Sequence, residues 1–268
     1  VELDDEVETD HFENLQSTNW QTVRWKPPPK SKPGAPHVGW RVEFRSMEVQ
    51  LTDFENAAFT VFVVLVSRVI LAFDLNLYIP LSKVDENMRR AHARNAAVEG
   101  TFFFRKHMAP PGRGAGDADA CEEMSALEIL DGKSDYFPGL IPLIFAYLES
   151  INCDSDTYEQ MRAYLDLIRK RASGEIQTAA QWMRSLIYKH PEYKHDSVVP
   201  EGIAHDLLKT IAEVAEGKRH EPRLLGEHRV APLRTDNAWY VPLKDERIRS
   251  EQREALLAAY SHRLFRRR

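Results

Sequence analysis

Cysteine is scarce in this chain, with only Cys121 and Cys153 among 268 residues. The two form no CxxC pair and have no histidine at ligand spacing, which argues against a zinc site and against a disulfide scaffold. Thiols that stay reduced are typical of the cytoplasm, so we expect a cytoplasmic location. We expect Cys121 to be an exposed bystander in a loop, and Cys153, after an apolar helix, to be packed.

Sequence features of three other functional classes are also missing. Neither GxxxxGK[ST] nor GxGxxG occurs, so neither a P-loop nor a Rossmann phosphate site is expected. The formal net charge of -5 gives no indication of a nucleic-acid partner. The longest apolar run, residues 57–73, is interrupted by Arg68, whereas a membrane-spanning helix needs about 20 mostly apolar residues. We therefore predict a buried core helix there and no membrane partner.

The residues that are present indicate a folded domain, with 43% hydrophobic and 29% charged side chains. No signal peptide opens the chain and it does not begin with Met, which we interpret as a processed product or a fragment. Residues 1–106 contain candidate strands and core helices, and residues 107–121 have the Gly, Pro and Asp content of a mobile loop. Residues 122–226 are predicted to be helical, and residues 227–268 form a basic tail. The predicted class is α+β.

The basic tail contrasts with the rest of the chain. From residue 217 onward there are 13 Lys and Arg against 7 Asp and Glu. A final helix whose last three residues are all arginine would suit the dipole of its C-terminus. We interpret the tail as a solvated helix, because charge runs alone are weak signals of nucleic-acid binding.

Local patterns predict where the elements begin. Thr52 and Glu55 form a T-x-x-E capping box at the start of the apolar helix. Ser82 and Asp85 are predicted to start a second helix, over 82–99. A short strand is predicted over 101–106. Apolar residues three and four apart then predict helices, over 126–130, 136–151, 157–171, 172–190 and 201–216. Side chains with this spacing that we place in the core are Met161, Leu165, Ile168, Trp182 and Met183.

A strand is predicted over 40–45. Because side chains alternate along a strand, one of its faces is apolar and the other is charged throughout. Its apolar side chains, which we expect in a core, are Trp40, Val42 and Phe44. Its charged side chains, about 7 Å apart in succession, are Arg41, Glu43 and Arg45. The alternation breaks after Ser46, as a bulge or a strand end would cause.

The charged face allows two interpretations. An exposed face with an ion pair is ordinary and contributes ~0–1 kcal/mol. An enclosed cluster, favoured by the apolar residues on either side, must be paired or bind something. A carboxylate suits Mg²⁺, and guanidinium groups on either side suit phosphate. The second interpretation is a site for a metal–nucleotide.

Several long segments carry a resemblance to a known family. They are HFENLQSTNWQTVRWKPPP, GWRVEFRSMEVQLTDFENAAF, IPLSKVDENMRRAHARNA, FPGLIPLIFAYLES and RASGEIQTAAQWMR. In this order they resemble the eukaryotic glutamate–cysteine ligase catalytic subunits, also called gamma-glutamylcysteine synthetases, over about residues 1–226. Ser46 departs from the family, since many relatives have Pro there, and the 107–124 loop also looks divergent.

The resemblance implies a glutamine-synthetase-like fold, in which an antiparallel sheet, only partly present here, forms a half-open barrel with helices outside. It implies a ligase that joins the gamma-carboxylate of L-glutamate to the amine of L-cysteine through gamma-glutamyl phosphate, the first step of glutathione synthesis. ATP is the co-substrate and Mg²⁺ is required. A smaller modifier subunit is a partner in animal members of the family.

The resemblance also implies roles for individual residues. Glu43 matches a metal ligand and Arg45 matches a residue near the transferred phosphate, while Arg41 is added from strand alternation only. The STNWQ segment is expected near the nucleotide, although a polar turn with a buried Trp is the equal alternative. Its candidate nucleotide-binding residues are Thr18, Asn19, Trp20 and Gln21.

The resemblance also implies that several acidic metal ligands of the family, and much of its glutamate and cysteine pocket, lie upstream of this sequence. One Glu cannot provide all the Mg²⁺ contacts that phosphoryl transfer requires, so we expect the isolated chain to be inactive. Two alternatives stay open. Residues 122–216 could be a non-enzymatic helical interaction module, or the chain could belong to a related carboxylate–amine ligase with another acceptor.

Overall fold

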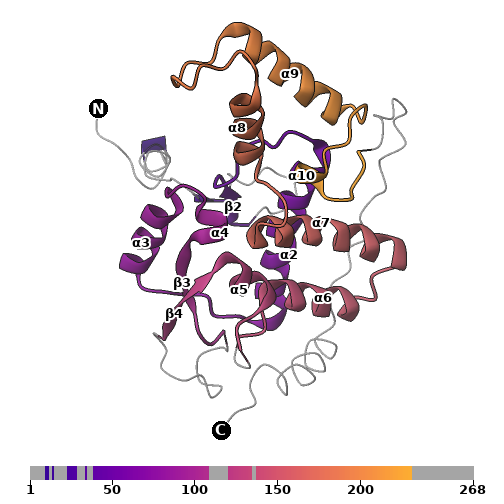
Figure 1. The fold of residues 1–268 in the computed structure, drawn as a ribbon. Helices are drawn as coiled ribbons and strands as arrows, with labels where there is room; N and C mark the ends of the chain where they lie inside the picture. Colours follow the sequence, from indigo (N-terminus) through magenta and orange to yellow (C-terminus); the bar gives the residue numbers. More distant parts are fainter. Residues whose placement is uncertain are drawn as a thin grey trace. The chain divides into compact units, whose positions relative to one another are not determined.

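The computed structural model shows two compact units, Val1–Val49 and Gln50–Arg268, and each is described by itself (Figure 1). The described residues are 10–11, 14, 23–28, 34, 39–108, 120–134 and 137–230. Outside them lie the STNWQ segment, residues 109–119 of the predicted loop and the tail from residue 231. The predictions for those parts of the chain therefore stay predictions.

The first unit contains an antiparallel hairpin of β1 (Val23–Lys26) and β2 (Arg41–Phe44), with Arg24 opposite Glu43. The strand predicted over 40–45 is confirmed. Its apolar face is not buried as predicted, and the exposed fractions are 56% for Trp40, 43% for Val42 and 48% for Phe44. Within the described residues the hairpin is a two-stranded sheet, and a sheet of two strands has no second layer of its own to cover an apolar face.

The second unit is mainly helical, and the predicted α+β class is confirmed. Its helices are α2 (Asp53–Phe73), α3 (Leu81–Ala91), α4 (Ala96–Glu99), α5 (Ala126–Asp131), α6 (Leu140–Ser150), α7 (Ser155–Ser173), α8 (Ala179–Lys189), α9 (Glu201–Ala215) and α10 (Pro222–Leu225). Its described strands, β3 (Thr101–Arg105) and β4 (Cys121–Ser125), pair antiparallel. Figure 1 shows α2 crossing behind α6 and α7, against which it packs.

Helix α2 begins where the capping pattern predicts. The Thr52 hydroxyl accepts a hydrogen bond from the Glu55 backbone N–H at 3.2 Å, and Asp74 ends the helix in the left-handed conformation. One face of α2 enters the core, as expected, through Phe54, Ala58, Leu65, Val69 and Phe73. Asn and Asp adopt the left-handed conformation more easily than other non-glycine residues, which suits this helix end.

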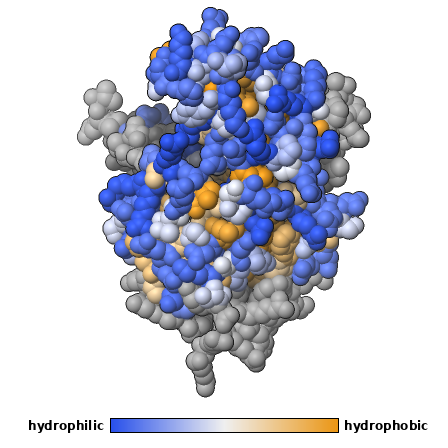
Figure 2. All heavy atoms as spheres, in the orientation of Figure 1, coloured by the Kyte–Doolittle hydropathy of each residue, from blue (hydrophilic) through white to orange (hydrophobic). Residues whose placement is uncertain are grey.

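The outer face of α2 remains apolar. Val64 is 52% exposed and Leu71 is 71% exposed. By length and composition alone, this 21-residue helix would be long and apolar enough to cross a membrane, with a mean hydropathy of 2.1. The core-helix prediction is thus confirmed for one face only. Figure 2 shows a mostly hydrophilic visible surface with an apolar area near its centre.

A buried ion pair joins α2 to α7. Glu55 has 0% exposure and Arg171 has 5%. The Arg171 guanidinium pairs with Glu55 Oε1 and also donates to Gln50 Oε1 at 2.8 Å, while the Thr52 hydroxyl donates to Glu55 Oε2 at 2.8 Å. Buried charges are tolerated when they are paired and hydrogen-bonded in this way.

The second predicted helix, 82–99, is wrong as a single element. Helix α3 begins at Leu81 directly after Pro80 and ends at Ala91, and α4 begins after Asn95, whose φ is 59°. A left-handed residue cannot continue a right-handed helix. Within α3, the Asn87 side chain hydrogen-bonds the Phe103 backbone, donating to its oxygen at 2.8 Å and accepting from its N–H at 2.7 Å.

Strand β4 was missed by the sequence reading, which treated residues from 122 onward as helical. Cys121 pairs with Arg105 at its first position and is half-buried, so it is neither in the loop nor exposed as predicted. Met124 of the same strand is fully buried. The strand predicted over 101–106 is confirmed as β3.

The remaining helical predictions are confirmed in outline. Trp182 has 0% exposure and its indole N–H donates to Glu221 at 3.3 Å, while Met161 and Met183 pack against the core. Cys153 is packed as expected, and burial raises the pKa of its thiol, with Asp154 adding a smaller effect. The helix predicted over 172–190 begins later than expected: residues 172–173 end α7, residues 174–178 form the turn that includes Gly174, and α8 begins at Ala179.

Candidate functional site

The charged face of the β1–β2 hairpin is the candidate site. Glu43 lies at the centre of β2 and forms ion pairs with Lys26 of β1 and with Arg45. The three side chains are 27%, 32% and 36% exposed in that order. Arg24 lies directly opposite Glu43 in the register, so three cationic residues surround one carboxylate.

These cations keep Glu43 ionised. The hydrogen bond from Lys26 is the largest cause of its lowered pKa, and the charges of Arg45, Lys26 and Arg24 lower it further, against a partial burial that raises it. A charged carboxylate is the form that binds a hard cation. The cations beside it are of the type that binds phosphate oxygens.

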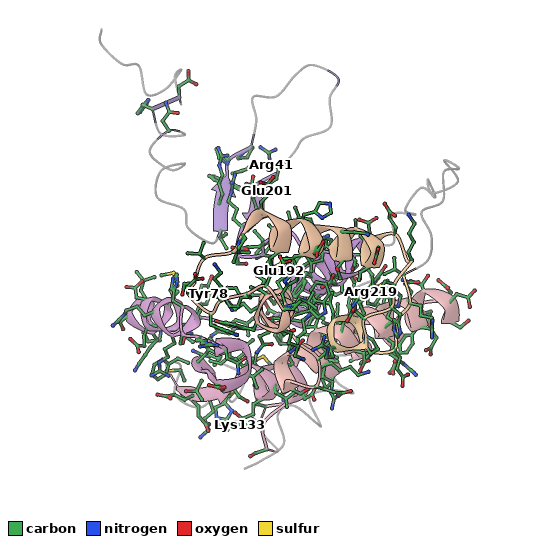
Figure 3. The ribbon with its side chains drawn as sticks, turned by 45° about the horizontal axis from the view of Figure 1, so that its top comes forward. Arg41, Tyr78, Lys133, Glu192, Glu201 and Arg219 are labelled. Carbon is green, nitrogen blue, oxygen red and sulfur yellow. The ribbon has the colours of Figure 1, made fainter. Side chains whose placement is uncertain are left out.

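The structure brings together Glu43 and Arg45, as the sequence predicts, but not Arg41. The Arg41 guanidinium instead donates to the backbone oxygen of Pro27 at 3.2 Å and is exposed. Figure 3 shows Arg41 on this hairpin. The catalytic role predicted for Arg41 stays a prediction, and its contacts in the hairpin give that role no support.

Lys26 and Arg24 were missed as site residues. The signal that could have found them is the segment VRWK, residues 23–26, which alternates apolar and basic side chains with the period of a strand. Pairing that strand antiparallel with WRVEFR would have placed its basic face beside Glu43. The Pro-rich connector between the two segments hid this relation.

The hairpin fits Mg²⁺ only in part. Glu43 provides one carboxylate, and across the described ranges no group of three or more His, Cys, Asp or Glu side chains comes together to hold a metal. Mg²⁺ is usually held by one or two protein carboxylates together with water and substrate phosphates. Glu43 therefore fits as one ligand of a site that needs further oxygen ligands.

An ionised carboxylate beside fixed cations can contribute to binding a hard cation and phosphate oxygens. The comparison with known protein families identifies the family to which the chain belongs. The family model for glutamate-cysteine ligase matches residues 1–214. The chain belongs to the glutamate–cysteine ligase family, which confirms the resemblance found in the sequence.

Individual relatives support the assignment. The chain is 50% identical over 238 residues to the human protein named glutamate–cysteine ligase catalytic subunit, covering 84% of this chain and 37% of that protein. It is 47% identical over 259 residues to the Neurospora crassa glutamate–cysteine ligase, covering 80% and 35%. For the Saccharomyces cerevisiae enzyme the identity is 41% over 220 residues, covering 77% and 31%. The chain thus spans about a third of the length of these relatives.

Proposed function

We propose that this chain is part of an ATP-dependent ligase that joins the gamma-carboxylate of L-glutamate to the amine of L-cysteine. The observation that carries the proposal is the Glu43–Arg45 ion pair within a segment that belongs to the glutamate–cysteine ligase family. In the proposed reaction a gamma-carboxylate oxygen attacks the gamma-phosphorus of ATP and ADP leaves. The cysteine amine then attacks the acyl carbon and phosphate leaves.

The proposed roles follow from the hairpin. Glu43 would supply one ligand for Mg²⁺, which neutralises phosphate charge when bound. Arg45 would hold the transferred phosphoryl group, and its present pairing with Glu43 supports this because it fixes the guanidinium beside the metal ligand. Lys26, on the opposite strand, would add a second cation there. Arg41 is retained as a weaker candidate.

The STNWQ segment is the part of the chain that we propose contacts the nucleotide. Its position just before β1 in the sequence supports a place near the charged face. We assign hydrogen bonds to the nucleotide to the polar side chains and an apolar wall to the Trp. These residues are Thr18, Asn19, Trp20 and Gln21.

The proposed setting is the cytoplasm, and the two free cysteines support a reducing compartment. L-Glutamate, L-cysteine and ATP are the proposed partners, together with a smaller modifier subunit implied by the family resemblance. The acceptor is the least constrained of these, since no described residue in the charged face selects a thiol. A panel of amines in place of cysteine tests for a related ligase with another acceptor.

ADP release is the test. It is measured on the 268-residue chain and on a version extended to the length of its relatives, with ATP, Mg²⁺, glutamate and cysteine each omitted in turn. We expect turnover only from the extended protein, because one carboxylate does not complete a metal site. Turnover by the short chain alone would show that the expectation of inactivity is wrong.

The Glu43→Gln substitution in the extended protein tests the role of the hairpin. We expect kcat to fall by roughly 10²–10³-fold, the usual effect of losing one group that stabilises developing charge. The matched control is Glu192→Gln, an exposed residue outside the hairpin, which should leave kcat unchanged. If Glu43→Gln retains full turnover, the hairpin is only a charged surface, and the helical interaction module becomes the better interpretation.

A further inference from the structure

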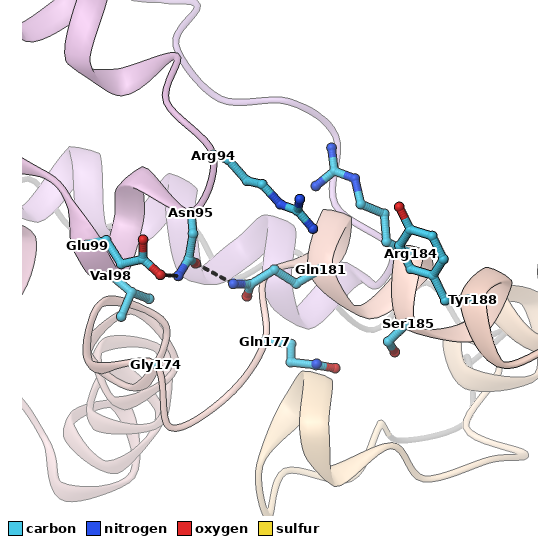
Figure 4. Close-up of a pocket in the computed structure, with 10 residues that line it drawn as sticks. All are labelled: Arg94, Asn95, Val98, Glu99, Gly174, Gln177, Gln181, Arg184, Ser185 and Tyr188. Carbon is cyan, nitrogen blue, oxygen red and sulfur yellow. Dashed lines mark hydrogen bonds between the residues drawn. The ribbon is translucent and has the colours of Figure 1, made fainter. Parts of the chain in front are cut away.

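A cavity of about 560 Å³ lies within the second unit, and its lining includes no residue used in the ligation proposal (Figure 4). Helix α8 supplies one wall. The side chains on that wall are Gln181, Arg184, Ser185 and Tyr188. Residues spaced by three and four positions share one face of a helix, so this face of α8 is turned to the cavity while Trp182 is buried on another.

The opposite wall comes from the turn before α4 and is fixed to α8 by a chain of hydrogen bonds. The Thr178 backbone N–H donates to Gln181 Oε1 at 2.9 Å, and Gln181 Nε2 donates to Asn95 Oδ1. Asn95 Nδ2 in turn donates to Glu99 Oε1 at 2.7 Å. Arg94 precedes Asn95, so these bonds hold its backbone at a fixed place on the cavity rim.

Two arginines line this cavity, one on each wall, and neither has an acidic partner among the described residues. Figure 4 shows the guanidinium groups of Arg94 and Arg184 pointing toward one another from the two walls. Neither forms an ion pair within the described part of the chain. Glu99 is the carboxylate among the lining residues, and Asn95 occupies one of its oxygens. Two guanidinium groups that point toward one another and have no ion-paired carboxylate among the described residues form a receptor for an anion, and their forked donors match phosphate.

The rest of the cavity suits a small organic molecule. Its volume lies in the range of ligand sites. Tyr188, 50% exposed, offers an aromatic surface, and Val98 offers an apolar one. Gln177 also lines the cavity, and its side-chain oxygen is buried without a donor among the described residues. A hydrogen-bond donor on a ligand would satisfy it.

We propose that this cavity binds a small molecule through a phosphate group held between Arg94 and Arg184. The molecule can be a free inorganic phosphate species or a nucleotide, because both present the same group to the two arginines. The proposal goes beyond ligation and does not depend on it, since Glu43 and Arg45 take no part in this cavity.

The test is calorimetric titration of the purified 268-residue chain with pyrophosphate, with AMP and with succinate. We expect Arg94→Gln and Arg184→Gln each to weaken phosphate binding roughly tenfold or more, the effect of losing a charged hydrogen-bonding pair. The matched control is Arg68→Gln, an exposed arginine of α2 outside the cavity, which should leave the Kd unchanged. Circular dichroism confirms that each variant is folded.

Each outcome is decisive. If AMP binds more tightly than pyrophosphate and Tyr188→Ala removes the difference, the ligand is a nucleotide. If the two bind equally and Tyr188→Ala changes neither Kd, the ligand is an inorganic anion. The proposal is overturned if no phosphate compound binds, if succinate binds equally well, or if the Arg68 control weakens binding as much as the cavity variants do. The proposal is also overturned if Glu43→Gln abolishes phosphate binding while Arg94→Gln and Arg184→Gln both still bind. That result would leave the ligation proposal standing.

Discussion

At the scale of single residues, the Glu55–Arg171 pair is the interaction whose loss should affect stability most. Both side chains are buried, and each has only the other as its ionic partner among the described residues. We expect Glu55→Gln to lower the free energy of unfolding by about 3–5 kcal/mol, because it leaves the Arg171 charge buried and uncompensated. Urea denaturation monitored by circular dichroism measures this.

The double variant Glu55→Gln/Arg171→Met is the informative control. Replacing both charges removes the desolvation cost together with the attraction, so this variant should be more stable than Glu55→Gln alone. Exposed Glu175→Gln should change stability by less than about 0.5 kcal/mol. A loss below about 1 kcal/mol for Glu55→Gln would show that water reaches the pair.

His228 provides a second prediction at this scale, in the pH dependence of stability. Its ring stacks on Phe54 with centroids 3.4 Å apart, and burial, with a smaller effect from His220, lowers its pKa below 6.5. Between that lowered pKa and about 6.5 the unfolded chain binds more protons than the folded one, so stability falls as the pH decreases through this window.

We expect His228→Phe, which keeps the stacking but cannot be protonated, to reduce this decline. Urea denaturation at intervals from about pH 7 to about pH 5 measures the difference between the two proteins. His92→Gln, at an exposed histidine, should leave the decline unchanged. Parallel pH curves for the wild type and His228→Phe would contradict the assignment.

At the scale of elements, the start of α7 depends on one side chain. Asp154 Oδ1 accepts a hydrogen bond from the Thr157 backbone N–H at 2.9 Å, which is the main cause of its lowered pKa. We expect Asp154→Ala to destabilise the protein by about 1 kcal/mol. Asp154→Asn keeps a side-chain acceptor and should lower stability less. Thermal or urea midpoints should therefore be highest for the wild type, intermediate for Asp154→Asn and lowest for Asp154→Ala.

The charge of Asp154 adds a pH dependence to this prediction. Because the folded pKa is lowered, the advantage of Asp over Asn is present above the unfolded pKa and is lost as the pH falls through the folded value. Glu159→Ala, in the exposed part of α7, serves as the control. Equal stability of all three residues at position 154 would show that α7 does not need its cap.

An element can be predicted from the sequence when the signals that form it are local. Helix α2 could be predicted because its cap at Thr52 and its apolar period are both local signals. Strand β4 could not, since CEEMS carries no strand alternation and becomes a strand only through pairing with Phe-rich β3. The break at Asn95 was hidden because Asn is also acceptable within a helix, and the residue that donates a hydrogen bond to the left-handed Asn95, Gln181, lies far along the chain.

The candidate site shows the same division. Glu43 and Arg45 were predictable because strand alternation and the family segment both single them out. Lys26 and Arg24 depend on which strand pairs with β2, which is a non-local fact. The core expected beneath Trp40 and its neighbours was wrong because alternation tells which residues share a face, but not what covers it.

At the scale of the whole molecule, the two units predict separable folding. Among the described residues, every side chain of the buried core cluster lies between Phe54 and Leu225, in the second unit. Since burial of apolar surface is the main source of stability, the first unit should contribute little to it. We therefore expect a shortened chain of residues 50–268 to unfold in urea at nearly the same midpoint as the full chain, with a slope lower in proportion to the surface removed.

The shortened chain also separates the two functional proposals. It lacks Glu43, which the ligation proposal requires, but it retains Arg94 and Arg184, which the phosphate-binding proposal requires. We expect it to bind pyrophosphate with the Kd of the full chain. A shortened chain that does not fold, or whose free energy of unfolding falls by more than about 2 kcal/mol, would show that the hairpin completes the core. Exposed Trp40 and Phe44 would then be the first side chains to substitute in the full chain, because theirs is the apolar surface that such a core would use.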